Sequence, residues 1–127
     1  MSRGDRCEAA SQDGAIQITL RTVDGCPHRI LAEERLRHAL AAPDAPMARI
    51  AHERVGTQAE AERVGFRGSP TILLDGHDPF AVAGDPVGLA CRVYRNEEGV
   101  EGAPSLARLR AALRRATADA AGRGDRR

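Results

Sequence analysis

The sequence has little of what would create a strong electrostatic field, a membrane segment or a disulfide framework. Its 127 residues include one tyrosine, two phenylalanines and no tryptophan, and 19 basic residues balance 18 acidic ones to a net charge of +1. Such a balance gives no overall attraction to nucleic acid or to an anionic membrane. The longest apolar runs span a few residues, far below the roughly 20 that a membrane-spanning helix needs, and residues 1–12 lack the apolar stretch of a signal peptide. We therefore expect a cytoplasmic protein that binds neither nucleic acid nor membrane.

The cysteines and the length set further bounds. Three cysteines are an odd number, and a cytoplasmic compartment keeps thiols reduced, so we expect reactive or merely buried thiols. A chain of this length fits one domain. Residues 1–14 and 118–127 are polar and small, which predicts disordered tails around one domain of residues 15–117.

Hydrophobic periodicity predicts a mixed α/β fold in the order β-α-β-α-β-β-α. Ile16, Ile18 and Leu20 alternate with polar residues as in a strand, whereas Leu36 and Leu40 share a helical face. The predicted strands are residues 15–23, 48–55, 71–74 and 89–94, and the predicted helices are residues 27–41, 57–64 and 104–116. The first two strands should be parallel and the last two antiparallel, which gives a four-stranded mixed sheet flanked by helices. The intervening residues 77–88 are predicted to form an inserted loop, which carries Phe80 and Val82 either as surface decoration or as a lid or partner contact.

Cys26 opens the tetrad Cys26-Pro27-His28-Arg29 at the junction between the first predicted strand and the first helix. A thiolate there meets unpaired backbone N–H groups and the positive end of the helix dipole. His28 and Arg29 add cationic or donor character, and Arg29 could hold an anion such as the carboxylate of a small thiol. Asp24 opposes the thiolate as a nearby like charge. We predict that Cys26 is a nucleophile; an inert thiol beside solvated helix-face side chains is the plainer alternative.

Ser69-Pro70-Thr71 leads into the predicted strand 71–74. A cysteine that ends strand one, together with an X-Pro-Thr that enters strand three, resembles the thioredoxin superfamily. The resemblance covers residues 15–116, including residues 60–71 and the start of the last helix. It implies a thioredoxin-like fold with a cis peptide bond between Ser69 and Pro70, lying against the Cys26 sulfur. It also implies that Ser69, Pro70 and Thr71 contact the substrate. Tyr94, at a strand end near Cys26, could add its hydroxyl there or simply pack.

The chain departs from this family at the motif. The tetrad resembles the Cys-Pro-His-Cys of strongly oxidising periplasmic relatives, but Arg29 stands where their resolving thiol would be. Attack by Cys26 would therefore leave a mixed disulfide, resolved by a small thiol, by another protein, or by a distant cysteine of this chain. Cys91 and Cys7 are the candidates. Cys91 shares a strand face with Leu89, so it is expected to be a buried small hydrophobe unless it is that second thiol, and Cys7 is expected to be a stray thiol in a tail.

A weaker resemblance comes from residues 77–88 and from the segment Cys91-Arg92-Val93-Tyr94. Both are similar to small bacterial thioredoxin-like proteins labelled alkylmercury-lyase-like, and two thiolates can bind a soft ion. Cys26 and His28 lack the paired spacing of a structural zinc site, so no resident metal or cofactor is expected.

Three functions remain open from the sequence. The first is a monothiol oxidoreductase that acts through Cys26 on protein thiols and disulfides or on a low-molecular-weight thiol. The second is a redox-inactive binding module that uses the edge beside Ser69 and Pro70. The third is thiol-based handling of mercury or organomercurials by Cys26 and Cys91.

Overall fold

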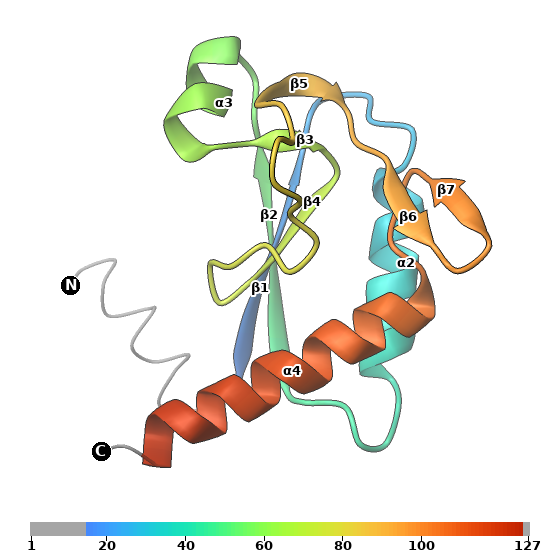
Figure 1. The fold of residues 1–127 in the computed structure, drawn as a ribbon, viewed down its shortest axis with the longest axis vertical. Helices are drawn as coiled ribbons and strands as arrows, with labels where there is room; N and C mark the ends of the chain where they lie inside the picture. Colours follow the sequence, from blue (N-terminus) through green and yellow to red (C-terminus); the bar gives the residue numbers. More distant parts are fainter. Residues whose placement is uncertain (1–14, 126–127) are drawn as a thin grey trace.

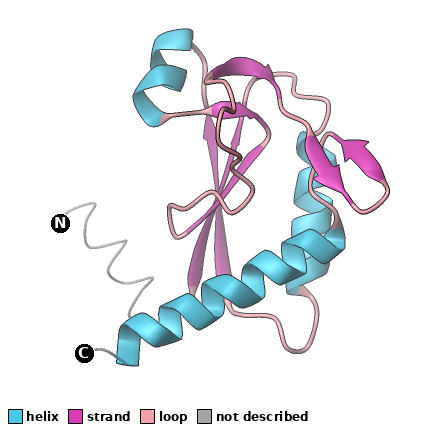
Figure 2. Cartoon of the chain, in the orientation of Figure 1, coloured by secondary structure: helices cyan, strands magenta, loops and turns pink. Residues whose placement is uncertain are grey.

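The protein is built around a three-stranded sheet in the order β2-β1-β4 (Figures 1 and 2). The structure, a computed structural model, describes residues 15–125, and beyond residue 119 it describes the backbone alone. β1 (Ile16–Thr22) pairs in parallel with β2 (Ala48–Arg54) and antiparallel with β4 (Thr71–Leu74). The mixed α/β class and the parallel pairing of the first two strands are therefore confirmed.

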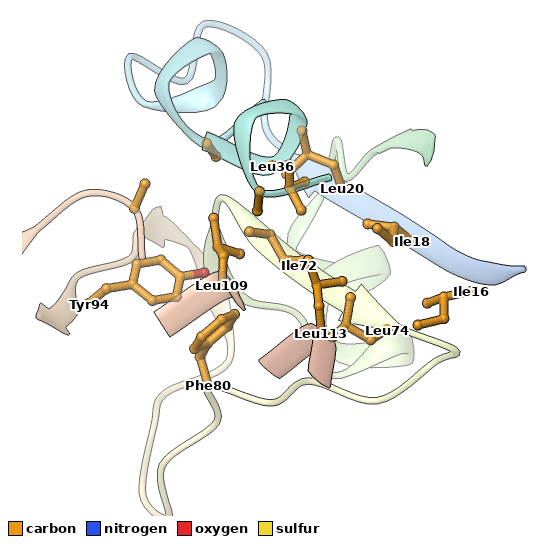
Figure 3. Packing of buried hydrophobic residues seen from close by; sticks show 13 residues of the cluster. Ile16, Ile18, Leu20, Leu36, Ile72, Leu74, Phe80, Tyr94, Leu109 and Leu113 are labelled. Carbon is orange, nitrogen blue, oxygen red and sulfur yellow. The ribbon is translucent and has the colours of Figure 1, made fainter. Parts of the chain in front are cut away.

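The main core lies between this sheet and two helices, α2 (Arg29–Leu40) and α4 (Leu106–Asp125). β1 buries alternate residues, as its sequence predicts. Figure 3 shows side chains from the sheet facing side chains from both helices. The labelled members of this cluster are Ile16, Ile18, Leu20, Leu36, Ile72, Leu74, Phe80, Tyr94, Leu109 and Leu113. Both helices thus contribute to one cluster with the sheet.

Helix α3 (Gln58–Val64) has the ends that its sequence predicts. The Thr57 side chain accepts a hydrogen bond from the Glu60 amide at 3.1 Å, and Glu60 in return accepts one from the Gly56 amide at 2.8 Å. The first bond satisfies one of the amides that a helix start leaves unpaired, and the second fixes the backbone just before the cap. Gly65 ends the helix in the left-handed conformation, at φ +68°. A second, smaller cluster of Val55, Ala61 and Phe66 forms under α3.

The prediction for residues 89–94 is wrong in its pairing. Instead of one strand beside residues 71–74, the segment divides at Arg92 and Val93 into two strands with different partners. The four short strands of this region are β3 (Arg67–Ser69), β5 (Gly88–Cys91), β6 (Tyr94–Asn96) and β7 (Gly99–Glu101). β5 pairs in parallel with β3, and β6 pairs antiparallel with β7. Three sheets thus replace the predicted four-stranded one.

The division has a physical cause in Arg92, which is 6% exposed. Its guanidinium turns inward and donates to Asp78 at 2.8 Å and to the Thr71 hydroxyl at 3.2 Å. A buried guanidinium is costly without such partners, so the contact with Asp78 sets the direction of the chain here. The strand pattern of the segment contains no sign of this distant partner.

Two helix ends also differ from the sequence prediction. Helix α2 begins at Arg29, after a turn at Pro27 and His28, rather than at Pro27. Helix α4 continues to Asp125, past residue 117, where the predicted domain ends. In the part of the chain that the structure describes, no helix is both long enough and apolar enough to span a membrane.

Candidate functional site

Cys26 lies in the turn that joins β1 to α2 and is partly exposed. Gly25 precedes it with φ +73°, a conformation that glycine adopts without strain. The Cys26 amide donates a hydrogen bond to the Val23 carbonyl at 3.2 Å, and the Cys26 carbonyl accepts one from the Arg29 amide at 3.4 Å. Because α2 begins at Arg29, Cys26 lies just ahead of the first helical turn and not within it.

Ser69 holds the start of this turn in place. Its side chain is fully buried, and its hydroxyl oxygen accepts a hydrogen bond from the Val23 amide at 3.1 Å. The Ser69–Pro70 peptide bond is cis, as the resemblance implies. Two hydrogen bonds, from Cys26 to Val23 and from Val23 to Ser69, therefore connect the cysteine turn to the segment that contains the cis bond.

Thr71 and Tyr94, two of the residues predicted to contact a substrate, make hydrogen bonds within the chain. Thr71 is 3% exposed, and its hydroxyl donates to the Gly68 carbonyl at 2.6 Å. Tyr94 is 2% exposed, and its hydroxyl donates to the carbonyl of Pro70, which is itself buried. The side chains of Ser69, Thr71 and Tyr94 thus support the segment from within, and substrate contact at Ser69, Pro70, Thr71 and Tyr94 stays a prediction.

Tyr94 belongs to a buried stack of aromatic rings and arginines. The Arg92 guanidinium lies 4.7 Å from the centre of the Tyr94 ring, and Phe80 meets that ring edge-on, with 5.6 Å between centres. Arg108 of α4 covers Phe80 at 4.9 Å. Such cation–aromatic and edge-to-face contacts stabilise a packed cluster, and burial raises the pKa of Tyr94 well above its ordinary value.

The inserted loop of residues 77–88 is anchored to this stack through Phe80. Phe80 is buried in it, so this side chain is not free to make the partner contact that was one of its predicted roles. Val82, further along the loop, is 60% exposed. The loop then returns to β3, where the Gly88 amide donates to the Phe66 carbonyl at 3.0 Å. The insertion is thus fastened at both ends.

His28 and Arg29 follow Cys26 and occupy different surroundings. The His28 ring lies tightly against Gly102: a β-carbon at Gly102 would fall 2.3 Å from His28 Cγ. Arg29 is largely exposed, and its guanidinium lies 3.6 Å from the carboxylate of Glu33. His28 is therefore held between α2 and the residues after β7, whereas Arg29 is available at the surface.

Asp24, the negative charge that the sequence places near Cys26, has an ion-pair partner. Asp24 lies 3.2 Å from the guanidinium of Arg54. A groove of about 380 Å³ borders the cysteine turn, and its lining includes both of these side chains together with Arg29 and His52. Arg29 of α2 and Arg54 of β2 thus lie beside the turn, together with the carboxylates of Asp24 and Glu53.

Cys91 is exposed, so the prediction that it is a buried small hydrophobe is wrong. It is the last residue of β5 and lies opposite Ser69 in the pairing of β3 and β5. Cys7 lies outside the described residues. Among residues that the structure describes, no three His, Cys, Asp or Glu side chains gather as metal ligands would.

Sequence reasoning missed Val23, Asp78 and Arg92 as supports of this site. Val23 acts through its backbone amide, which no residue pattern identifies. Arg92 carried a signal, since a charged residue interrupts an otherwise apolar segment, but only the fold reveals Asp78 as its partner.

Comparison of the chain with protein-family models, with curated proteins and with solved structures finds no match in any of the three. The thioredoxin resemblance therefore remains a hypothesis that depends on the residues quoted for it.

Proposed function

We propose that the protein is a cytoplasmic thiol–disulfide redox protein, a single-cysteine-motif member of the thioredoxin superfamily, in which Cys26 is the nucleophile. Its thiolate attacks a disulfide RSSR, forms a Cys26–S–S–R mixed disulfide and releases RS⁻. The bond formed and the bond broken are both S–S bonds, so this step needs no other oxidant. The substrate is a low-molecular-weight disulfide or a disulfide of a partner protein.

One observation carries this proposal: the partly exposed Cys26 is joined through Val23 to the buried Ser69, next to Pro70. A thiol with only a packing role needs neither exposure nor a fixed turn. Exposure gives a disulfide access to the sulfur, and the hydrogen bonds fix the backbone from which the sulfur projects. Arg29 and Arg54 line the groove beside the turn and could hold the carboxylate of a small disulfide.

The alternative of a passive binding module is less well supported. It requires a free backbone edge beside Ser69, but β5 already pairs there. The Arg92 amide donates to the Ser69 carbonyl at 2.9 Å, and the Gly88 amide is likewise used by Phe66. An extended peptide would have to displace β5 to bind that edge. A small disulfide that reaches Cys26 directly avoids this cost.

The test is the rate of iodoacetamide labelling at each cysteine of the reduced full chain, measured against pH by peptide mass spectrometry. If Cys26 is the nucleophile, it should react at neutral pH at least about tenfold faster than free glutathione. Cys91, which is also exposed, is the internal control and should react at about the rate of free glutathione. Labelling of Cys26 no faster than glutathione across the pH range would contradict the proposal.

A second arm separates redox chemistry from binding. Glutathione disulfide should add one glutathione to Cys26 in a Cys7→Ser/Cys91→Ser chain, and Cys26→Ser in the same background should abolish the adduct. A chain that never forms the adduct would fit the binding module and not the proposal.

A further inference from the structure

Cys91 is paired to the same serine that holds the Cys26 turn. β5 lies in register with β3 so that Cys91 is opposite Ser69, and neighbouring strands are about 4.8 Å apart. The side-chain hydroxyl oxygen of Ser69 accepts the hydrogen bond from the Val23 amide. Ser69 therefore lies between the strand that carries Cys91 and the turn that carries Cys26.

Packing fastens the same two elements to each other. Val23, at the start of the cysteine turn, and Leu89, on β5, both pack against the cluster of Val55, Ala61 and Phe66. In Figure 1, β5 and the loop from β1 to α2 lie at the same end of the molecule. The segments that carry the two cysteines thus meet the same serine and the same cluster, although 65 positions separate the cysteines in the sequence.

The two segments also retain room to adjust. A disulfide needs α-carbons about 4.4 to 6.8 Å apart. The pairing of β5 with β3 shifts register between Arg67 and Ser69, so β5 is not part of a continuous ladder. Arg92 anchors the chain just after Cys91 by its contact with Asp78, while Cys91 itself stays exposed. Cys26 lies in a turn next to Gly25, outside any helix or strand.

We propose that Cys91 is the second thiol of this protein and that it resolves the mixed disulfide on Cys26. This inference rests on the proposed function. The Cys91 thiolate attacks the Cys26 sulfur, forms a Cys26–Cys91 disulfide and expels RS⁻, so RSSR is reduced to two thiols while the protein loses two protons and two electrons. A low-molecular-weight thiol, used twice, returns the protein to its dithiol form. The pair supplies the second sulfur that Arg29 replaces in the tetrad.

The experiment uses the full chain with Cys7→Ser, alone and combined with Cys91→Ser or Cys26→Ser. Each reduced protein is mixed with glutathione disulfide, quenched in acid at increasing times, and mapped by mass spectrometry without reduction. The Cys7→Ser chain should pass through a short-lived Cys26 adduct to a Cys26–Cys91 disulfide. With Cys91→Ser the adduct should persist. An intramolecular thiol has an effective concentration on the order of millimolar, so with external thiol held at about 10 µM the adduct should last about 100-fold longer.

The outcomes separate this inference from the proposed function. An adduct on Cys26 that persists equally with and without Cys91 would overturn the second thiol and leave the proposed function standing. A disulfide-linked dimer through Cys91, seen on a non-reducing gel, would also overturn it. Absence of any Cys26 adduct in the Cys91→Ser chain would instead remove the proposed function. Circular dichroism of each variant confirms that the compared chains are folded, and both cysteines are partly or fully exposed, so serine is tolerated at either site.

Discussion

The hydroxyl of Tyr94 donates a hydrogen bond to the carbonyl oxygen of Pro70 from a ring that is almost fully buried. This bond joins β6 to the segment that leads into β4. The Tyr94 ring also packs against Phe80 of the inserted loop and lies under the Arg92 guanidinium. One side chain therefore connects the Pro70 segment, the insertion and the buried arginine.

Tyr94 should resist ionisation until the protein unfolds. Its pKa is raised in the folded state by burial, whereas in the unfolded chain it is about 10. The neutral phenol therefore contributes stability that is fully present below pH about 10 and is lost as the pH rises above that value. Tyr94 is the only tyrosine and tryptophan is absent, so near-ultraviolet phenolate absorbance reports this residue alone. We expect the phenolate signal to appear together with the loss of circular dichroism. A phenolate that titrates near pH 10 in a chain with unchanged circular dichroism would contradict the buried position.

Replacement of Tyr94 by phenylalanine provides the matched variant. It removes the hydroxyl but keeps the ring that packs on Phe80, and it leaves the buried Pro70 carbonyl without its partner. The loss should lower the free energy of unfolding at neutral pH by about 1 to 3 kcal/mol, measured by urea denaturation. Its stability should also decline less steeply above pH about 10, because no phenol remains to ionise in the unfolded state.

We expect glycine to be required at position 102, because the His28 ring packs directly against it. An alanine β-carbon would lie 2.3 Å from His28 Cγ, so the ring would have to move. Overpacking of this kind costs about 1 to 3 kcal/mol, and we expect Gly102→Ala to lower the urea midpoint accordingly. In a His28→Ala background the same substitution should cost much less, since the clash is gone. Gly56→Ala is the control, because its β-carbon would meet Glu60 at an ordinary 3.5 Å. Equal costs of Gly102→Ala with and without the histidine would contradict the contact.

Arg92 and Asp78 should be strongly coupled. Their side chains are 5% and 13% exposed and lie 2.8 Å apart. Removal of one partner leaves a poorly solvated charge, at a cost of about 3 to 5 kcal/mol, so Arg92→Met should be severely destabilising in urea denaturation. Arg92→Met with Asp78→Asn should recover part of that loss, which a double-mutant cycle measures as coupling energy. The Arg21–Glu53 pair has the same 2.8 Å separation but a half-exposed carboxylate; its coupling should be about 0.2 to 1 kcal/mol. Similar coupling in both pairs would show that burial adds nothing.

Local signals in the sequence were sufficient for the first half of the fold. The alternation of Ile16, Ile18 and Leu20 predicted β1, and Thr57 and Gly65 predicted both ends of α3, because each signal acts within a few residues. The division of residues 89–94 could not be predicted. It depends on the Arg92–Asp78 contact, and a partner this far along the chain leaves no periodic trace.

The candidate site was likewise predictable only in part. Cys26 was predicted from its motif and the cis bond at Pro70 was implied by the family resemblance; the structure has a cysteine turn and a cis bond there. The exposure of Cys91 was not predicted, because its apolar neighbours suggested a buried strand. Its exposure follows from the inward turn of Arg92, which reverses the expected faces of the segment. The prediction failed where one buried charge outweighed the hydrophobic pattern.

Part of the free energy of unfolding should depend on the ionised form of Glu101 and should be lost in acid. The hydrogen bonds from Arg35 and Asn96 hold the pKa of Glu101 below its ordinary value. A lowered folded-state pKa contributes stability that is present above the unfolded-state value, about 4.5, and is lost as the pH falls through the folded-state value. Glu101→Gln should therefore be less stable than the parent chain at pH about 7 and should approach it at pH about 3, as measured by urea denaturation.

The matched control for this prediction is Glu98→Gln in the turn between β6 and β7, which is exposed. It should change stability little, because substitution of an exposed side chain usually has a small effect on the free energy of unfolding. Arg35 also donates to the carbonyls of Ala103 and Pro104 and so ties α2 to the start of α4. Arg35→Met should consequently cost more than Glu101→Gln at pH about 7, and part of its cost should persist in acid, because carbonyl partners do not titrate. If the losses from both substitutions vanished together at low pH, the carboxylate would be the sole significant partner of Arg35, and the link from α2 to α4 would carry no stability of its own.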